Sequence, residues 1–424
     1  MNRRNFLYSS AGLPLLSQLH RDPHAGLPQQ PPRFPDEKYW KELRWHFFIP
    51  RGEAYCNTAT LGSSPKCVVN AIHDHMRYVD TNVVASKYRG DNPHFLGGYQ
   101  DEPTLRNRVA KIMGCTKEEV ALTMNSTMGS SYIAMGLDLQ RGDEVVITDQ
   151  EHPGGRSAYD VRAKRDGIII REAKIPQPPN DPDKIVEAFS KVITDKTRIL
   201  AISHMTSALG LLLPAKRIVQ LCRERSKDCF IVLDGAQVMG HVAFDVRDLG
   251  CDAYVSSPHK WLLAPKGTGV MFIAKEASHR VWNTIASGEW DNQKDPGWRF
   301  TQIGTGNQSL HKGFEAVLDF LGRVGLEVIQ ARIKELGDRL RAGLREIPGV
   351  TIKSSIHPDM CAGTTTYEVA GYTNEQVAYT LWKKDRIMPR PLGPGVRQSF
   401  HIYNLHDDVD RTLARIRKLV AAKR

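Results

Sequence analysis

Short apolar runs alternate with amphipathic stretches through the middle of the chain, from Val120 onward. The runs are Val145 to Ile147, Ile168 to Ile170, Ile199 to Ile202, Phe230 to Leu233, Tyr254 to Val255 and Val270 to Ile273. Runs of this length, separated by helical stretches or turns, are typical of a largely parallel sheet that helices cover on both faces. Ligands of such sheets bind beyond the carboxyl ends of the strands. The pattern therefore predicts an α/β domain with its site at that edge.

The period of the apolar positions becomes helical beyond Gly304. One face of a long helix is marked by Leu326, Ile329, Ile333, Leu336, Leu340 and Leu344. Strands are expected near residues 350–352 and 364–369, followed by a helix over 374–382 and a last helix from Asn404. In that last helix Asp407 stands at capping-box spacing from Asn404. This tail predicts a smaller α+β domain.

A chain of 424 residues is longer than one hydrophobic core usually serves, so we expect two domains. Residues 1–35 are expected to be a signal and linker, and residues 36–60 an N-terminal arm that joins the small domain. The large domain is expected over residues 61–305 and the small domain over residues 306–424.

The N-terminus carries two adjacent arginines, Arg3 and Arg4, followed by Phe6 and Leu7 and a weakly hydrophobic stretch. This order resembles a twin-arginine export signal, which is a receptor-read address and no part of the fold. We therefore expect export to the periplasm. A chance pair of arginines in a leader is the alternative, and the protein would then be cytoplasmic.

The net charge of +11 does not by itself indicate nucleic-acid binding, because the basic residues are spread along helices such as 332–345 and 411–424. No apolar run approaches the roughly 18 residues of a membrane span. The seven cysteines are scattered and no two have C-x-x-C spacing. We therefore expect no nucleic-acid partner, no membrane span, no metal site and no disulfide framework.

Two of the predicted strands deliver opposite charges to the same sheet edge. The run that begins at Phe230 ends in Asp234, and the run that begins at Tyr254 leads into Lys260. A lysine that can form a Schiff base and a carboxylate that keeps a pyridine nitrogen protonated are what pyridoxal phosphate requires. Such a site also needs helix-start amides for the phosphate and an arginine for the substrate carboxylate. The pair therefore predicts a pyridoxal phosphate site.

Both strand ends carry sequence motifs. Ser257-x-His259-Lys260 matches S-x-H-K, and Asp234-Gly235-Ala236-Gln237 matches D-x-A-[QH]. In these motifs the chain resembles the class V aminotransferases, the family of cysteine desulfurases and isopenicillin N epimerase-like enzymes, from about residue 55 to 410. The resemblance implies the pyridoxal phosphate-dependent fold type I. This fold is α/β, with a mostly parallel seven-stranded sheet between helices and a smaller C-terminal α+β domain.

The resemblance implies roles for residues at matching positions. Catalysis would fall to Lys260, Asp234 and His152, whose ring would stack on the cofactor. Other residues would hold the cofactor: Gln237 at the ring hydroxyl, Ser126, Thr127 and Ser257 at the phosphate, with His259 beside it, Ser207, and Thr305 at the neighbouring subunit's phosphate. Arg397 would bind the substrate α-carboxylate, and Asn57 would line the substrate pocket. A homodimer with shared active sites follows from the role of Thr305.

The segment before Arg397 bears on the reaction. Residues 386–395 contain no cysteine, whereas desulfurases carry a nucleophilic cysteine there; the nearest is Cys361. The stretch from Ser203 to Pro214 also resembles the epimerase-like branch more than the desulfurase pattern. We therefore expect an epimerase, racemase or aminotransferase that acts on a small α-amino acid through a Lys260 aldimine and an α-carbanion.

Three questions stay open at the level of sequence. A C–S lyase or cysteine desulfurase-like enzyme is the first alternative to the epimerase-like reaction. A non-catalytic binding protein that retains the fold is the second. The second acid/base of the reaction could be His152, Tyr88 or His204.

Overall fold

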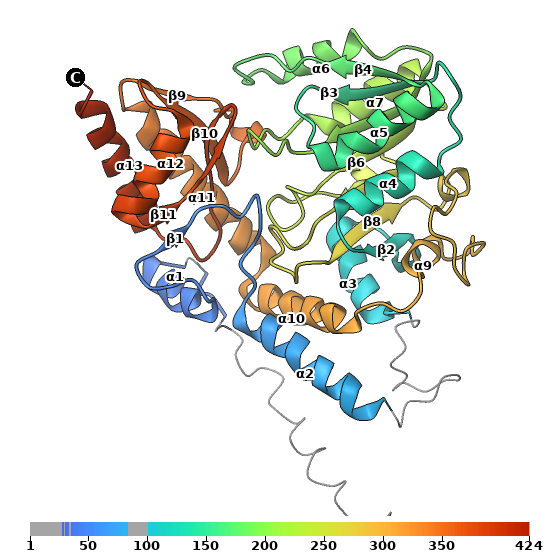
Figure 1. The fold of residues 1–424 in the computed structure, drawn as a ribbon, viewed down its shortest axis with the longest axis horizontal. Coiled ribbons are helices and arrows are strands. Elements are labelled where there is room, and N and C mark those ends of the chain that lie inside the picture. Colours follow the sequence, from blue (N-terminus) through green and yellow to red (C-terminus); the bar gives the residue numbers. More distant parts are fainter. Residues whose placement is uncertain (1–27, 29, 34, 84–100, 424) are drawn as a thin grey trace, which may run out of the picture.

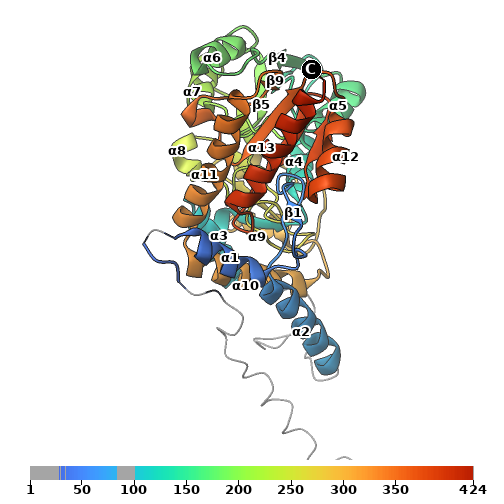
Figure 2. The same cartoon turned by 90° about the vertical axis from the view of Figure 1, so that its left-hand side faces the viewer.

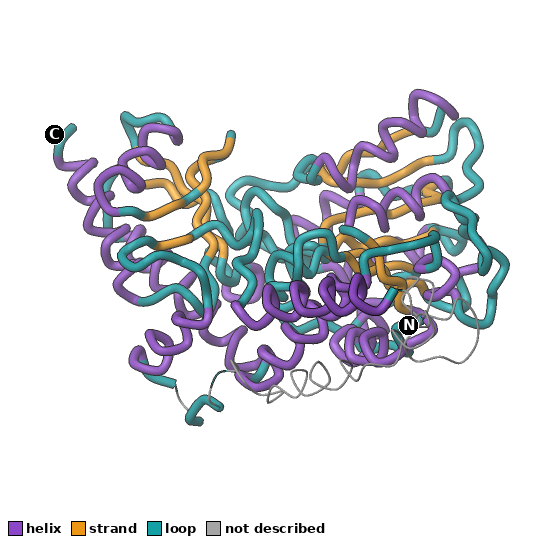
Figure 3. Tube along the Cα trace, turned by 60° about the horizontal axis from the view of Figure 1, so that its bottom comes forward, coloured by secondary structure: helices purple, strands orange, loops and turns teal. Residues whose placement is uncertain are grey.

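The computed structural model describes residues 28, 30–33, 35–83 and 101–423. Two lobes lie side by side, each built on its own sheet (Figure 1). The tube view separates the two sheets, with long helices running beneath them (Figure 3). The twin-arginine stretch and Tyr88 lie outside the described residues.

The large lobe contains a seven-stranded sheet in the order β2-β8-β7-β6-β5-β3-β4. Its strands are β2 (Val120–Thr123), β3 (Glu144–Thr148), β4 (Ile169–Ala173), β5 (Thr197–Ser203), β6 (Phe230–Asp234), β7 (Ala253–Ser256) and β8 (Gly269–Ile273). The prediction of an α/β, mostly parallel seven-stranded sheet is confirmed, with β8 as the exception. This strand runs antiparallel to both β2 and β7. A parallel pair needs a long crossover, usually a helix, and residues 257–268 between β7 and β8 form turns without a helix.

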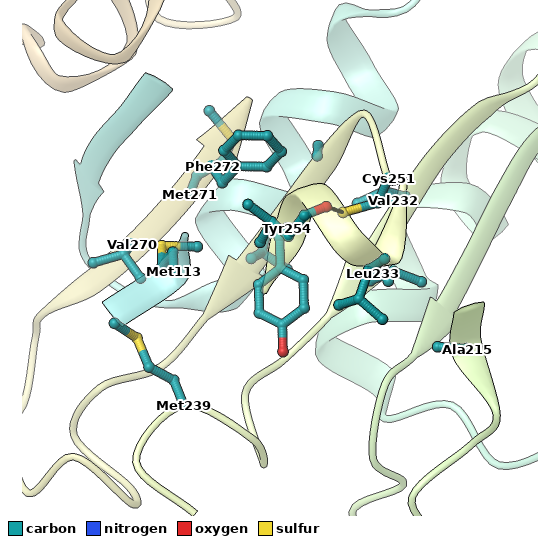
Figure 4. Close-up of a cluster of buried hydrophobic side chains, with 14 of the residues drawn as sticks. Met113, Ala215, Val232, Leu233, Met239, Cys251, Tyr254, Val270, Met271 and Phe272 are labelled. Carbon is teal, nitrogen blue, oxygen red and sulfur yellow. Dashed lines mark hydrogen bonds between the residues drawn. The ribbon is translucent and has the colours of Figure 1, made fainter. Parts of the chain in front are cut away.

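Helices cover this sheet and its margins. They are α2 (Lys66–Asn82), α3 (Pro103–Met113), α4 (Ser126–Gly136), α5 (Pro153–Asp166), α6 (Pro182–Ser190), α7 (Ala215–Arg225), α8 (Val246–Leu249), α9 (Pro296–Thr301) and α10 (Gln308–Val324). The central strands are buried on both faces, which explains why their sequences are continuous apolar runs. Figure 4 shows Tyr254 of β7 between Leu233 of β6 and Val270 to Phe272 of β8.

The small lobe is a four-stranded antiparallel sheet in the order β12-β13-β10-β9. Its strands are β9 (Val350–Ile352), β10 (Thr364–Val369), β12 (Arg390–Leu392) and β13 (Gly395–Ser399). Figure 2 shows its three helices facing the viewer, namely α11 (Leu326–Arg345), α12 (Asn374–Asp385) and α13 (His406–Ala421). The small α+β domain expected from the sequence is therefore present.

The start of α13 differs from the expected cap. The carboxylate of Asp408 accepts a hydrogen bond from the Leu405 backbone N–H at 3.1 Å, whereas Asp407 pairs with Arg411 at 2.9 Å. Asn404 is buried, and its side-chain amide donates to the Tyr55 carbonyl at 3.1 Å. The expected cap at Asn404 and Asp407 is wrong by one residue because Asn404 serves a contact to the N-terminal arm.

The N-terminal arm and α10 connect the lobes. β1 (Ala54–Tyr55) pairs with β11 (Ile387–Met388) of the small lobe, while Trp40 of α1 (Glu37–Leu43) packs in the large lobe's core. Helix α10 also belongs to that core and lies along α2 (Figure 1). The change from one core to the other therefore falls within α11, beyond the division expected at residue 305. An amphipathic pattern shows that a helix has a buried face, but it does not show which sheet that face covers.

Within the described ranges, none of the helices combines the length and apolar character needed to cross a bilayer.

Candidate active site

Lys260 lies in the turn that follows β7, at a cavity of about 290 Å³. Its backbone N–H donates to the Ser257 carbonyl at 3.0 Å, and the N–H of Gly62 donates to the His259 carbonyl at 2.9 Å. A Cβ on Gly62 would lie 2.0 Å from the Lys260 carbonyl oxygen. The lysine turn is therefore held by the loop that follows the N-terminal arm, and only a glycine at position 62 lets the two backbones approach so closely. Sequence reasoning missed Gly62, because no local pattern marks contacts across the whole chain.

Asp234 reaches the same cavity from the end of β6, the strand beside β7. Its Oδ1 accepts from the Ala236 N–H at 2.8 Å. Burial lowers the pKa of Lys260 to about 8, and the nearby Asp234 carboxylate opposes that effect. Burial raises the pKa of Asp234, opposed by the charge of Lys260. Among the described residues, Lys260 and Asp234 form no salt bridge with each other. Both side chains are therefore available to a cofactor ring bound in the cavity.

One end of the cavity is built from the N-terminus of α4. Ser126 donates its N–H to the Ser257 hydroxyl at 3.0 Å, and that hydroxyl donates to Ser126 Oγ at 3.0 Å. Thr127 also lines this end. A Cβ on Gly129 would meet Val255 Cγ1 at 2.7 Å, so glycine lets α4 pack tightly on β7. Amides and hydroxyls at a helix start form a ready site for a phosphate.

His152 lines the cavity at the start of α5. Its Nδ1 accepts from the Gly154 N–H at 3.1 Å, so the neutral ring carries its proton on Nε2. Burial is the main cause that lowers the pKa of His152, and the charge of Lys260 adds to it. The structure therefore places a neutral imidazole beside Lys260 and Asp234.

His204, by contrast, lies behind the strand ends. It is 7% exposed, its Nδ1 lies 3.1 Å from the Tyr254 hydroxyl, and it is not among the residues that line the cavity. Burial lowers the pKa of His204 to about 4, which keeps it neutral. Of the three candidates for the second acid/base, His152 alone is placed at the cavity within the described residues; Tyr88 is outside them.

Arg397 of β13 is 1% exposed and contacts Ser207 and Thr60, two residues that line the cavity. Its Nη1 donates to the Ser207 carbonyl at 2.6 Å, and its Nη2 donates to Thr60 Oγ1 at 2.6 Å and Asn57 Oδ1 at 3.2 Å. Its Nε is buried without a hydrogen-bond partner. Burial lowers the pKa of Arg397 to about 10, which leaves it charged at neutral pH. A buried guanidinium that meets only neutral oxygens in the described part of the chain is suited to bind a carboxylate.

The remaining expected residues occupy different places. Gln237 lines the cavity, but its amide donates to the Ala59 carbonyl at 2.9 Å and accepts from Trp261 Nε1 at 2.8 Å. Ser207 lines the cavity and its hydroxyl accepts from Arg397 at 3.3 Å. His259 also lines the cavity, and its Nδ1 lies 3.2 Å from the Thr268 carbonyl oxygen. Thr305 lies in an exposed turn before α10, away from the residues that line this chain's cavity.

Several residues at the cavity were not expected. They are Thr60, Asn125, Ser203, Met205 and Arg390. Arg390 lies within residues 386–395, which contain no cysteine. Its positive charge, close in sequence to Arg397, is the signal that could have indicated it.

The assembled groups fit pyridoxal phosphate. An amine, a carboxylate and an imidazole line the cavity without an ion pair between the first two, and the N-terminus of α4 adds hydroxyl groups to the wall. Arg397, whose Nε has no hydrogen-bond partner, lies behind Thr60 and Ser207 of the cavity wall. These are the anchor, the ring-nitrogen partner, the stacking group and the phosphate cradle that this cofactor requires.

Comparisons with known proteins point the same way. The family model "Aminotransferase class-V" matches residues 55–412. The isopenicillin N epimerase of Amycolatopsis lactamdurans is 30% identical over 74% of this chain and 84% of its own length. The isopenicillin N epimerase of Streptomyces clavuligerus is 29% identical over 88% of this chain and 96% of its own length. A probable cysteine desulfurase of Halalkalibacterium halodurans is 29% identical over 84% of this chain and 90% of its own length.

The fold is also shared with solved structures. The cystine C–S lyase C-DES, in complex with cysteine persulfide, superimposes with a TM-score of 0.77 at 24% identity, over 87% of this chain and 98% of that chain. A C-DES variant with glycine covalently linked to its pyridoxal phosphate cofactor superimposes with a TM-score of 0.79 at 24% identity, over 88% of this chain and 98% of that chain. The fold type I architecture expected from the sequence is therefore confirmed.

Proposed function

Because the chain belongs to the class V aminotransferase family and is a pyridoxal phosphate-dependent enzyme, we propose that it acts as an epimerase-like enzyme. In this proposal it removes the α-proton of an amino acid and returns a proton to the product, as an epimerase, racemase or aminotransferase. The observation that carries the proposal is the absence of a thiol from the cavity.

All seven cysteines belong to the described part of the chain, and none of them lines the cavity. Cys361, the nearest in sequence to the expected loop, is 5% exposed, and its Sγ lies 3.1 Å from the His357 carbonyl oxygen. Burial raises the pKa of Cys361, which lowers its nucleophilicity at neutral pH. A mechanism that passes sulfur to an enzyme thiol has no candidate thiol here.

Each residue at the cavity has a task in the proposed reaction. Bound pyridoxal phosphate supplies an electron sink for the pair of electrons that the departing α-proton leaves. Lys260 Nζ anchors the cofactor and then accepts this proton, for which an amine with a pKa of about 8 is well matched to neutral pH. Asp234 holds the ring nitrogen in its protonated form, and Arg397 fixes the substrate carboxylate.

The fate of the proton separates the possible reactions. Return to the opposite face of the same carbon gives epimerisation, and this requires an acid other than Lys260. His152, with its proton on Nε2, is the described residue in position to hold the ring and to serve in this step. Return to a cofactor carbon gives transamination.

The test is incubation of the purified enzyme with single amino acids in deuterated water. α-Deuteration with loss of chirality supports epimerisation, and release of a keto acid with retention of the amino group on the enzyme supports transamination. Release of sulfide or of an eliminated side-chain group, without deuterated amino acid, would overturn the proposal in favour of a C–S lyase. Sulfide release that disappears in Cys361→Ala would indicate a desulfurase.

A non-catalytic binding protein is the alternative from another class. Lys260, Asp234 and His152 line one cavity, and Arg397 contacts its wall through Ser207 and Thr60, which supports an enzyme. A purified protein that stays colourless after pyridoxal phosphate is added would contradict the cofactor proposal itself.

We also propose a homodimer with shared sites and export through Arg3 and Arg4. The exposed position of Thr305, outside its own chain's cavity, supports a contact with a second subunit. Mixing Lys260→Ala with Thr305→Glu should restore activity through one intact site per hybrid dimer; two inactive parents that remain inactive when mixed would contradict shared sites. An Arg3-Arg4→Lys-Lys variant that still reaches the periplasm would contradict the export proposal.

A further inference from the structure

Arg390 and Arg397 are cross-strand partners. In the antiparallel pairing of β12 with β13, the two residues lie directly opposite each other. Directly opposed residues project from the same face with Cβ atoms about 4.5–5.5 Å apart, and like charges in this arrangement destabilise a sheet. The fold therefore holds two guanidinium groups side by side at a cost in stability.

Neither arginine is neutralised by the residues that the structure describes. Nη1 of Arg390 donates to Thr60 Oγ1 at 2.7 Å, and Nη2 of Arg397 donates to the same oxygen at 2.6 Å. Neither guanidinium forms a salt bridge with a described carboxylate. Arginines elsewhere in this lobe do have acidic partners, such as Arg415 with Asp385 at 2.6 Å. Arg397 keeps only its Nε without a partner, whereas Arg390 makes a single hydrogen bond to the described residues, so most donors of Arg390 remain for a ligand.

The charge of Arg390 acts on the cavity. It lines the cavity together with Lys260, and Asp234 is the single acidic residue among the described lining residues. Its positive charge contributes to lowering the pKa of Lys260, of His152 and of Arg397. The N-terminus of α4 would hold the phosphate of pyridoxal phosphate, which would leave the two arginines to other anions. An anionic group of the substrate is then the ligand that Arg390 is suited to bind.

We propose that Arg390 binds a second carboxylate on the substrate, so that the enzyme acts on amino acids with an acidic side chain. This rests on the proposed function, in which Arg397 takes the α-carboxylate. Arg397 is 1% exposed and rigidly held by Ser207, Asn57 and Thr60. Arg390 is exposed at the mouth of the cavity, where side chains of different length can reach it. The competing arrangement has both arginines on one α-carboxylate.

The first experiment compares matched pairs of amino acids with the holoenzyme. α-Deuterium exchange is measured for aspartate, glutamate and 2-aminoadipate against asparagine, glutamine and norleucine. The wild type should prefer the acidic member of each pair. Arg390→Gln should raise KM for the acidic members on the order of 10- to 100-fold, which is the loss expected for hydrogen bonds to a charged group. KM for the neutral members should change by less than about 3-fold on the same basis.

The matched control is Arg386→Gln, which removes the same charge four residues earlier. Arg386 lies over the Trp382 ring at 5.1 Å and does not line the cavity. Arg386→Gln should leave KM unchanged for both the acidic and the neutral amino acids. An equal rise in KM for acidic and neutral amino acids in Arg390→Gln would overturn the proposal, because it would place Arg390 on the α-carboxylate. Absence of an acidic preference in the wild type would also overturn it.

A second measurement does not depend on turnover. Titration calorimetry of the holoenzyme with glutarate and with butyrate compares two anions that carry no amino group. Glutarate should bind more tightly than butyrate, and Arg390→Gln should remove this difference. If no amino acid exchanges its α-proton, the proposed function fails, while the glutarate titration still decides whether a second carboxylate site exists. Equal binding of the two anions by the wild type would refute that site.

Discussion

Lys260 and Asp234 face one cavity from the ends of two neighbouring parallel strands and form no salt bridge with each other among the described residues. The charge of each group shifts the pKa of the other in the direction that favours both charged forms. Here the backbone of Ala236 holds Asp234 at 2.8 Å, and the turn after β7 holds Lys260. The separation is therefore a property of the fold, and it is the feature that a planar cofactor can use.

The pKa of Lys260 gives the first prediction. Burial lowers this pKa to about 8, and the amine attacks the cofactor aldehyde only in its neutral form. The rate at which the apoenzyme takes up pyridoxal phosphate should therefore rise with pH and level off above about pH 8. Stopped-flow absorbance at the wavelength of the bound cofactor measures it. Lys260→Ala should show no such band, and a rate that rises on to pH 10.5 would contradict the assignment.

Arg397 gives the second prediction. Lysine at this position keeps a charge but loses the fork that contacts Ser207, Asn57 and Thr60 at once. Arg397→Lys should lower kcat/KM about 10- to 100-fold, as expected when hydrogen bonds to a charged group are lost. The cofactor spectrum should stay as in the wild type, since Arg397 does not hold the ring. A variant that loses the cofactor instead would show that Arg397 supports the fold of the site.

Gly62 gives the third prediction. A methyl group there would lie 2.0 Å from the Lys260 carbonyl oxygen and 2.8 Å from Leu263 Cδ2. Gly62→Ala should therefore shift the lysine turn and destabilise the protein by about 1–3 kcal/mol, the usual result of overpacking. Cofactor affinity should fall with it, which titration of the apoenzyme by absorbance measures. The control is Gly288→Ala, because a Cβ at Gly288 has nothing within 4 Å.

Sequence patterns were informative wherever one segment carries its own signal. The apolar strand runs that end in Asp234 and lead into Lys260 located the sheet edge, and the motifs around them predicted two residues that the structure places at one cavity. The antiparallel course of β8 was not visible, because period and composition show that a strand exists but not its direction. The placement of α10 in the large lobe's core was missed for a similar reason.

Contacts between distant segments lay beyond sequence reasoning. Gly62 meets Lys260 only because the N-terminal arm folds back over the lysine turn. Arg390 is an ordinary basic residue in the sequence, and it becomes distinctive only when register places it opposite Arg397. His204 stood in a family-like stretch, yet the fold turns it toward Tyr254 and away from the cavity. These relationships depend on pairing and burial, which no local pattern encodes.

The last prediction concerns three histidines in the interior, His204, His241 and His401. Burial lowers their pKa values to about 4, about 3 and about 4. The unfolded chain binds protons at these residues below about pH 6.5, whereas the native protein does not until the pH is much lower. The unfolded state therefore holds more protons in this range, and stability falls as the pH falls from about 6.5 to 4. At pH 5 each histidine should cost on the order of 2 kcal/mol.

His241 is the best site for the test, because both its nitrogens have partners. Its Nδ1 lies 2.9 Å from the Gln237 carbonyl oxygen, and its Nε2 accepts from the Gly363 N–H at 2.8 Å. Protonation of Nε2 would remove that acceptor and place a charge against the stacked Trp261 ring, 3.5 Å away. His241→Gln should therefore unfold at a lower urea concentration at pH 7 but lose less stability between pH 7 and pH 5 than the wild type. Exposed His279→Gln is the control, and a pH slope unchanged in His241→Gln would show that other groups cause the acid sensitivity.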